Sequence, residues 1–498
     1  MCSVGNVMTR PRMPIMNEIQ TVSWNLPALH KSVDAFTTQP VMRDNPMRFG
    51  NLVQRFNGRE CAPDGIAETG SLDSVKKRGS SDMKQVVVIV DGFMTGNTIA
   101  DEVRRRGLAC INVMSSSTIP QILQKSLVPK KFIENHLYGG SIRDLADKLS
   151  GFRVVAVLPG AETAVELTEK LAFELAIPCN DPTTTHLRRN KYAMIESLRK
   201  AGFNTAKQCV AIDAAEIISW RNQQRLSWPV VVKPIDSAGT DSVTMCFSDR
   251  QIEEAVARII GQVNILGKTN SCALAQSFLD GTEYVVNTLS WNGIHGVTDV
   301  WRYAKREVAG AGRIYDRDEL ISADGELQNA LIDYVVRALD VLGVKYGPSH
   351  CEIMMTQRGP ALVELGARVQ GSINVQFMQR CIGSDQLNQA IDLYRERDGI
   401  TGRFLCATKL KEQGMRVEMI SEVDGILRDR ASFVSAIEAL PSYFSHYLNC
   451  QELQPIRRTV DLADTPGEVL LVHRNQEQLM HDYALLRSME KRHIVPMR

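Results

Sequence analysis

The sequence lacks the patterns that mark membrane, secreted and nucleic-acid-binding proteins. No run of 18 or more apolar residues occurs, and residues 1–10 have no apolar centre of the kind that a signal peptide carries. Basic and acidic residues nearly balance, at 58 and 57, so the net charge of +1 predicts no nucleic-acid or anionic-membrane partner. We therefore expect a cytoplasmic protein with neither kind of partner.

Closely spaced cysteines are missing as well. The chain has 11 cysteines, but even the nearest two, Cys381 and Cys406, lie too far apart for the short spacings of zinc sites and redox motifs. We expect reduced thiols, most of them buried.

What remains is typical of a globular chain. Its 498 residues are 44% hydrophobic and 23% charged, which allows roughly three domains. Residues 1–83 show no sustained apolar period and predict a poorly ordered extension, whose role the sequence does not reveal.

Residues 84–186 alternate strand and helix patterns. β-Branched runs predict buried strands, and the segments between them predict helices. The strands are expected at 86–91, 108–113 and 153–158, and the helices at 98–106, 141–149 and 160–176. This alternation predicts an open, doubly wound (Rossmann-like) parallel sheet, whose ligands bind at the carboxyl ends of the strands.

The rest of the chain mixes antiparallel hairpins with helices over 187–400 and ends in a smaller α+β unit over 401–498. Ser248 and Gln251 predict a capping box at the start of an amphipathic helix. Further elements are expected as a helix at 327–342, strands at 404–409, 415–420 and 468–472, and a last helix at 476–490.

Two glutamates and an arginine stand at fixed offsets on a predicted hairpin. A turn at 356–359 separates two apolar runs, of which the first begins with Glu352 and the second ends with Glu364, so the carboxylates are predicted to meet across antiparallel strands. Mg²⁺ is often shared between one or two carboxylates and substrate phosphates, and Arg368 suits a planar anion. The alternative is an exposed glutamate pair beside a surface arginine.

A lysine at the end of a buried strand suggests a phosphate site. Lys233 follows the apolar run 228–232 and precedes the small residues of 235–242, whose backbone amides can approach phosphate oxygens. The alternative is a strand-end lysine that reaches solvent. Further on, the connector 275–287 offers polar groups to an adenine edge, with Glu283 for ribose hydroxyls, or else forms an ordinary hairpin.

Two glycine patterns are excluded as nucleotide sites. Five residues rather than four separate Gly261 from Gly267, and the segment follows a helix, so it is not a P-loop. The pattern Gly310-Ala-Gly312 lacks the third glycine of a dinucleotide fingerprint, so no hydride chemistry is implied.

Taken in order, several motifs resemble a known family over about residues 84–490. These motifs are Arg189-Asn-Lys191-Tyr-Ala-Met-Ile, Leu198-Arg-Lys-Ala-Gly202-Phe, Val-Val-Val-Lys233-Pro, Phe278-Leu-Asp-Gly-Thr-Glu283-Tyr, His350-Cys-Glu352 and Glu364-Leu-Gly-Ala-Arg368-Val-Gln-Gly371. They resemble the ATP-grasp carboxylate-amine ligases. The closing segments 440–442 and 465–471 are similar to the branch of bacterial L-amino acid ligases, the bacilysin-type dipeptide synthetases.

The resemblance implies an ATP-grasp fold that binds ATP and Mg²⁺ or Mn²⁺, with a lid subdomain at about 205–282. The ATP-binding residues it implies are Lys191, Lys233, Ser237, Gly239, Thr240, Gln276, Phe278, Leu279 and Glu283. Glu352 and Glu364 would bind the metal, and Arg368 the transferred phosphoryl group. Two positions depart from the family, because Gly366 stands where many relatives have Asn, and Gln276 replaces a common Glu.

The substrate side is less defined. Arg302 and Arg313 are candidates for binding a carboxylate, with a solvated loop as the alternative. Glu162 is a candidate for an amino group, with helix capping as the alternative. Arg368 and the Gly371 amide are candidates for stabilising the oxyanion that forms when an amine attacks.

We therefore expect an ATP- and Mg²⁺-dependent ligase that joins an amino-acid carboxylate to an amine, in the favoured case a second amino acid, through an acyl-phosphate with release of ADP and phosphate. Such chemistry needs positioning and charge neutralisation rather than a Ser-His or Cys-His pair. The alternatives are an ATP-grasp ligase or carboxylase acting on a non-peptide carboxylate, and a catalytically inactive nucleotide-binding scaffold. A homodimer is left open.

Overall fold

The computed structural model describes residues 83–308, 312–371, 373–396 and 409–497, which all belong to one compact unit, Lys77–Arg498. The predicted N-terminal extension, except its last residue, lies outside the described residues. So do most of the predicted strand at 404–409 and the first two residues of Gly310-Ala-Gly312.

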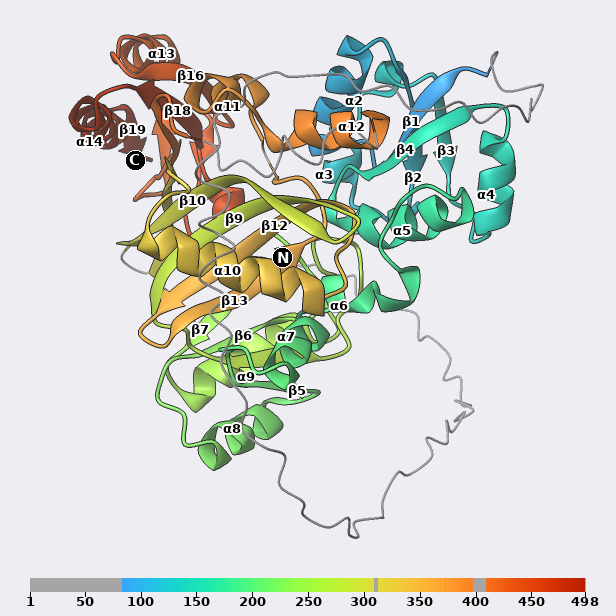
Figure 1. The fold of residues 1–498 in the computed structure, drawn as a ribbon. Helices are drawn as coiled ribbons and strands as arrows, with labels where there is room; N and C mark the ends of the chain where they lie inside the picture. Colours follow the sequence, from blue (N-terminus) through green and yellow to red (C-terminus); the bar gives the residue numbers. More distant parts are fainter. Residues whose placement is uncertain (1–82, 309–311, 372, 397–408, 498) are drawn as a thin grey trace, which may run out of the picture. The chain divides into compact units, whose positions relative to one another are not determined.

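A four-stranded parallel sheet in the order β3-β2-β1-β4 begins the described chain (Figure 1). Its strands are β1 Gln85–Val90, β2 Ala109–Met114, β3 Glu134–Leu137 and β4 Arg153–Pro159. Its helices are α2 Thr95–Arg105, α3 Gln121–Gln124, α4 Ile142–Leu149 and α5 Val165–Glu174, with 3-10 turns at Pro129–Lys131 and Glu162–Ala164. The β1 run from Val86 to Val90 is at most 1% exposed, as a strand covered on both faces requires. The predicted doubly wound sheet is confirmed.

A link of short helices follows, consisting of the 3-10 turn Pro182–Thr184, α6 His186–Arg189 and α7 Lys191–Lys200. A second, antiparallel sheet in the order β5-β8-β6-β7 comes next. Its strands are β5 Gln208–Ala211, β6 Val230–Pro234, β7 Thr244–Cys246 and β8 Ala273–Ser277, covered by α8 Ala214–Gln223 and α9 Asp249–Ile259. At the start of α9 the Ser248 side chain accepts from the Gln251 N–H, but the Gln251 side chain accepts from the Phe247 N–H rather than from Ser248, so the capping box is shifted by one residue.

An eight-stranded sheet in the order β13-β12-β9-β10-β11-β14-β18-β16 occupies the centre. Its strands are β9 Gly281–Trp291, β10 Ile294–Val308, β11 Gly312–Ile321, β12 Gly347–Thr356, β13 Gly359–Gly366, β14 Gln413–Glu418, β16 Tyr443–Leu448 and β18 Gly467–His473. Helix α10, Glu326–Val341, lies across one face of this sheet (Figure 1). There its apolar side chains pack with those of α7 and of the strands, including Val286, Ile353 and Leu365. The opposite face carries an apolar cluster that includes Val285 and Trp301, and beside it the polar side chains described below.

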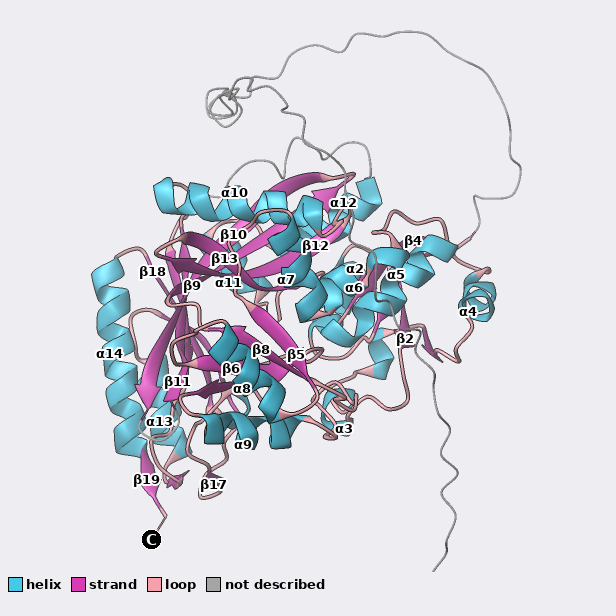
Figure 2. Cartoon of the chain, turned by 90° about the horizontal axis from the view of Figure 1, so that it is seen from below, coloured by secondary structure: helices cyan, strands magenta, loops and turns pink. Residues whose placement is uncertain are grey.

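The C-terminal strands β14, β16 and β18 extend this same sheet instead of forming a separate one. A small sheet, β17-β15-β19, consists of β15 Gly425–Leu427, β17 Pro455–Ile456 and β19 Ile494–Pro496. The remaining helices are α11 Val375–Cys381, α12 Gln386–Glu396, α13 Arg430–Glu438 and α14 Gln476–His493, with a 3-10 turn at Leu462–Asp464. Figure 2 shows α14 beside the strands that include β18. Among the helices of the described ranges, none is long and apolar enough to cross a membrane.

The connector from β8 to β9 does not form the ordinary hairpin that was one reading of residues 275–287. Strand β8 belongs to the four-stranded sheet and β9 to the eight-stranded sheet, so this short segment joins two different sheets. At Gly281 a Cβ atom would lie 2.1 Å from the Met355 carbonyl oxygen of β12, so the connector enters the larger sheet at a position that only glycine fits.

Candidate active site

The predicted glutamate pair forms on the face of the eight-stranded sheet that lies opposite α10. Strands β12 and β13 pair antiparallel with Glu352 directly opposite Glu364, and Gly359 completes the turn with a φ of 93°. Both side chains are about a quarter exposed, at 26% and 25%. The predicted meeting of the two carboxylates is thus confirmed, and they face a partly open site.

His350 lies beside the pair, with Nε2 3.5 Å from Glu352 Oε1. Burial favours a higher pKa for Glu352, but the hydrogen bond and charge of His350, together with Lys305 and Lys191, lower that pKa overall. Glu352 is therefore a carboxylate at neutral pH, which is the form that binds a cation.

Lys191 and Lys233 come to the same site from two other elements. Lys191 begins α7, and its Nζ is 2.7 Å from Glu364 Oε1 and 2.6 Å from the Ser237 carbonyl oxygen. Lys233 is the next-to-last residue of β6 and is 5% exposed. Burial first, and then the charge of Lys191, lower the pKa of Lys233 to about 8, although nearby glutamates oppose this shift. The site therefore holds two buried lysines beside two carboxylates.

Loop 236–241 is held in place by its neighbours. Ser237 Oγ donates to Asp241 Oδ2 at 2.7 Å, and the Ile265 N–H donates to the same oxygen at 3.1 Å. Gly239 and Thr240 both adopt positive φ, at 62° and 60°, which turns the loop sharply. The excluded P-loop pattern at 261–269 is a loop after α9, as expected, and it serves to support loop 236–241.

The residues predicted for adenine and ribose lie in β8, in the connector that follows it and in β9. Gln276 is buried in β8, and its amide donates to the Gln208 side chain at 3.2 Å. Phe278 and Leu279 are half-buried in the connector itself. Glu283 is buried in β9, where Lys305 lies 2.6 Å away and the Tyr315 hydroxyl donates at 3.1 Å. The sequence reasoning did not identify Lys305 and Tyr315 as partners of Glu283.

Arg368 makes an ion pair with the N-terminal part of the chain. Its Nε is 2.5 Å from Glu162 Oε2, and Arg189 pairs with the other Glu162 oxygen. Burial alone favours a raised pKa for Glu162, but Arg368, Arg189 and Lys191 outweigh it and lower the pKa to about 2. Arg189 also pairs with Asp236 at 2.6 Å. Glu162 therefore contacts two cations rather than acting as a helix cap, since neither 3-10 turn Glu162–Ala164 nor α5 has a side-chain N-cap.

The three remaining predicted residues have different surroundings. Arg302 lies opposite Glu319 and Tyr284 on neighbouring strands, so it shares their face and not the face of Glu283, and it is ion-paired with Glu319. The structure therefore does not bring Arg302 to the face of Glu283, and its role in binding substrate stays a prediction. Arg313 is exposed near the start of β11, on the face of Tyr315. Gly371 is exposed, with open space around it.

A buried polar network behind the glutamate pair was not predicted. The amide nitrogen of Asn287 donates to Asp299 and to Gln370 at 2.5 and 2.7 Å, and its oxygen is 2.8 Å from His350 Nδ1. Burial raises the pKa of Asp299 despite its three side-chain hydrogen bonds. The network orients His350 toward Glu352. Its members belong to separate strands and loops, so the only signal in the sequence was a set of polar residues inside apolar runs.

The glutamate pair fits a divalent cation. Across the described chain, no group of three or more His, Cys, Asp and Glu side chains is arranged to hold a metal ion. Two carboxylates on one sheet face with lysines nearby match the way Mg²⁺ is bound by one or two carboxylates and completed by phosphate oxygens and water. The donor set is all oxygen, as a hard cation requires.

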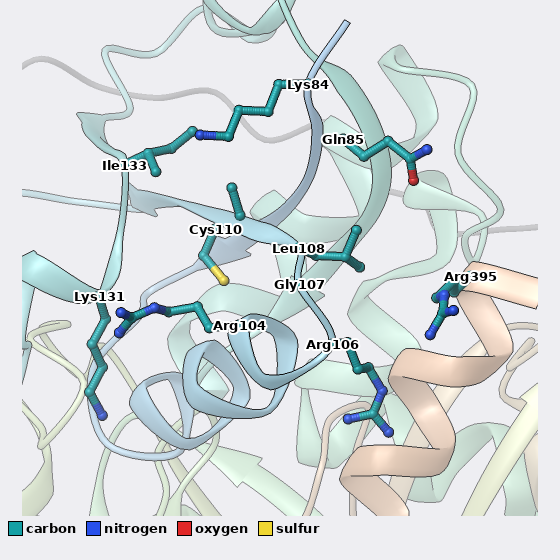
Figure 3. A pocket seen from close by; sticks show the side chains of 11 residues that line it. Lys84, Gln85, Arg104, Arg106, Gly107, Leu108, Cys110, Lys131, Ile133 and Arg395 are labelled. Atoms are coloured by element: carbon teal, nitrogen blue, oxygen red, sulfur yellow. The ribbon is translucent and has the colours of Figure 1, made fainter. Parts of the chain in front are cut away.

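A groove of about 710 Å³ lies away from these residues (Figure 3). It opens at the amino ends of β1 and β2, and Figure 3 shows Arg104 and Arg106 from the end of α2 and Arg395 from α12 around it. Two of its cations are neutralised, since Lys131 pairs with Asp101 and Arg106 with Asp392. This groove contains none of the site residues described above.

Comparison with known proteins agrees with the geometry. The ATP-grasp domain family matches residues 226–376. Dapdiamide A synthase of Enterobacter agglomerans is 30% identical over 419 residues, which cover 82% of this chain and 96% of that protein. The crystal structure of L-amino acid ligase from Bacillus licheniformis matches with a TM-score of 0.64 at 18% identity, covering 83% of this chain and 99% of the other. A carboxyaminoimidazole ribonucleotide synthase from Aspergillus clavatus, complexed with ATP, matches with a TM-score of 0.60 at 12% identity, covering 82% and 99%.

The parallel sheet, the small antiparallel sheet and the large sheet with its charged face define an ATP-grasp enzyme. More narrowly, the chain belongs to the family of ATP-grasp ligases that includes dapdiamide A synthase. It is a ligase that uses ATP to form a carbon–nitrogen bond, and the expected fold class and enzyme class are confirmed.

Proposed function

We propose that this protein is a cytoplasmic, Mg²⁺-dependent L-amino acid ligase. It joins the carboxylate of one amino acid to the amine of a second one through an acyl-phosphate and releases ADP and phosphate. Its relatives support the proposal, since one is named dapdiamide A synthase and another L-amino acid ligase.

One observation carries the proposal: Glu352 and Glu364 face each other on the same sheet face, with Lys191 in contact with Glu364. Glu352 and Glu364 would hold Mg²⁺, which when bound neutralises the charge on the ATP phosphates. Lys191 and Lys233 would bind phosphate oxygens, and the backbone of Ser237, Gly239 and Thr240 would cover them. The site thus neutralises charge, which is the main requirement of phosphoryl transfer.

The other residues complete the reaction. Gln276, Phe278 and Leu279 would border the adenine, and Glu283 would accept from ribose hydroxyls once ATP displaces Lys305 or Tyr315. The substrate carboxylate attacks the γ-phosphorus, the bond to the β-phosphate oxygen breaks, and ADP leaves. Arg368 would hold the transferred phosphoryl group. The amine then attacks the acyl carbon, Arg368 and the Gly371 amide stabilise the oxyanion, and phosphate leaves as the amide forms.

The test is to supply ATP, Mg²⁺ and pooled amino acids, and to identify both the nucleotide product and any new amide by mass spectrometry. We expect ADP, phosphate and a dipeptide, and no turnover when Mg²⁺ is replaced by a chelator. Formation of AMP would contradict the acyl-phosphate route. ADP formation that depends on a carboxylate other than an amino acid would contradict the proposed substrate class, and absence of any turnover would favour an inactive scaffold.

A further inference from the structure

Glu162 occupies an unusual place for a carboxylate. It follows the carboxyl end of β4, is 6% exposed, and lies between two arginines that come from distant parts of the chain. Arg189 pairs with one oxygen, and Arg368 Nε pairs with the other at 2.5 Å. A carboxylate withdrawn from water needs such partners, and their charges keep its pKa low at about 2.

Gly366 explains how this ion pair is accommodated. A Cβ atom at Gly366 would lie 3.1 Å from Glu162 Oε2 and 3.3 Å from Arg368 Cζ. The backbone of Gly366 is not in the left-handed region, so a side chain there would meet the ion pair and no backbone strain, and Glu162 and Arg368 would have to shift by a few tenths of an ångström to admit it. A side chain at position 366 would therefore press on the contact between Glu162 and Arg368.

We propose that Glu162 is a positioning residue for Arg368, and that position 366 is glycine because a side chain there would displace this contact. The proposal rests on the proposed function, in which Arg368 holds the phosphoryl group. It replaces the reading in which Glu162 takes a substrate amine, because both Glu162 oxygens already face guanidinium groups.

The donor inventory of arginine supports the proposal. A guanidinium group has five N–H donors in a fixed plane. The ion pair uses Nε, the nitrogen nearest the main chain, and Nη1 donates to the Val369 carbonyl oxygen at 3.1 Å. Two contacts fix the plane of the guanidinium and leave other donors for an oxyanion, so Glu162 orients Arg368 without consuming it.

The first experiment compares Glu162→Gln with Glu166→Gln in the full-length protein. Glu166 is an exposed glutamate on α5 that pairs with Lys170, so it controls for the loss of a charge close by in sequence. Glu162→Gln should lower kcat about 10- to 100-fold and leave KM for ATP and for the amine within about twofold, as expected for loss of a group that orients a catalytic side chain. Glu166→Gln should match the wild type.

A second measurement does not depend on turnover. Calorimetry with ADP, Mg²⁺ and orthovanadate, an oxyanion that stands in for the transferred phosphoryl group, reports whether Arg368 is oriented. Vanadate binding should weaken by about tenfold or more in Glu162→Gln, while ADP binding alone stays unchanged. If the wild type showed no amino-acid-dependent turnover, the proposed function would fail, but this comparison would still decide the role of Glu162.

The third comparison tests Gly366. Gly366→Asn adds an oxygen donor next to the metal pair, but it should lower kcat by about as much as Glu162→Gln, and the double variant should be no worse than the poorer single variant because both act on one contact. Gly366→Ala should have a smaller effect of the same kind.

Three results would overturn the proposal. One is a raised KM for the amine with unchanged kcat in Glu162→Gln, which would show an amine-binding role. Another is tighter Mg²⁺ binding with unchanged kcat in Gly366→Asn. That result would show that glycine at position 366 matters only because it offers no ligand to the metal. The last is vanadate binding that is absent in the wild type or equal in wild type and Glu162→Gln.

Discussion

The parallel sheet has cationic side chains at the carboxyl ends of its strands, which we call its carboxyl edge, and at the amino ends, which we call its amino edge. The cations pair with a buried carboxylate at the first, and several of them are exposed at the second. At the carboxyl edge, Glu162 is buried between Arg189 and Arg368. At the amino edge, around the groove of Figure 3, Lys84, Arg104 and Arg395 are exposed. The same residue types thus have different roles at the two edges. Buried ion pairs fix the geometry of a site at the cost of desolvation, whereas solvated cations contribute little to either geometry or stability.

Helix α5 repeats this contrast within three residues. Glu169 is buried and pairs with the fully buried Arg188, which also donates to backbone carbonyls of Asp181 and Leu342. Glu166 on the same helix pairs with Lys170 in solvent. Variants at the two kinds of position therefore measure how strongly burial changes the contribution of an ion pair to the free energy of unfolding.

The largest effect is expected from Glu364→Ala. This change removes one of the two paired carboxylates and the partner of Lys191, so turnover should fall by about a thousandfold or more while the fold is retained. Steady-state kinetics and circular dichroism check this. Glu254→Ala, which removes an exposed partner of Arg250, is the control and should be as active as the wild type. Near-normal turnover of Glu364→Ala would contradict the proposed metal site.

The largest effect on stability is expected from Arg188→Met. The change leaves Glu169 as a buried carboxylate without its cation and frees three backbone carbonyls, which should cost about 3–5 kcal/mol in the free energy of unfolding. Denaturant unfolding measures this quantity. Lys170→Met should change it by less than about 0.5 kcal/mol. Equal effects of the two variants would contradict the distinction between buried and solvated pairs.

A pH dependence should follow from Lys233, whose pKa is lowered to about 8. Below this pH the buried ammonium group is present and attracts phosphate. Above this pH Lys233 has to take up a proton from solvent when ATP binds, so the affinity for ATP should fall by up to about tenfold per pH unit. The unfolded chain, with a lysine pKa of 10.5, binds more protons between the two pKa values, so this group's contribution to stability rises with pH there. Calorimetry of ATP binding in buffers of different ionisation enthalpy tests the proton uptake, and Lys233→Arg should remove it.

The smallest effect is expected at the amino edge. Arg104 stands in the last turn of α2, where a cation is favoured by the helix dipole, so Arg104→Glu should lower stability by only about 0.5–1 kcal/mol. Its kcat and KM values should match those of the wild type. A marked loss of turnover would show that the groove takes part in catalysis and would remove the contrast between the edges.

The sequence predicted the parts of the site that depend on local pattern. The turn at 356–359 and the apolar runs beside it fix the register that pairs Glu352 with Glu364. Likewise, the apolar run before Lys233 places that lysine at a strand end. Each of these features arises within a few residues, where turn chemistry and alternation decide the structure.

The parts that were missed depend on contacts between distant segments. Glu162 was assigned to substrate because nothing near it in the sequence shows that Arg189 and Arg368 surround it. Arg302 was placed in the site because its segment precedes the hairpin, but strand alternation turns it to the other face, toward Glu319. Similarly, the connector to β9 has the local pattern of a hairpin, and only the pairing of whole sheets separates its two strands.

Arg189 has a consequence for the catalytic cycle. Its guanidinium holds Asp236 at the start of loop 236–241 and also holds Glu162. A displacement of this loop would break the contact of Arg189 to Asp236, along with the contacts that Lys191 and Ile265 make to the loop, while Glu162 would still pair with Arg189 and Arg368. In the proposed reaction, ADP would then leave while the guanidinium group of Arg368 stays oriented, so that each new turnover would begin with Arg368 in place.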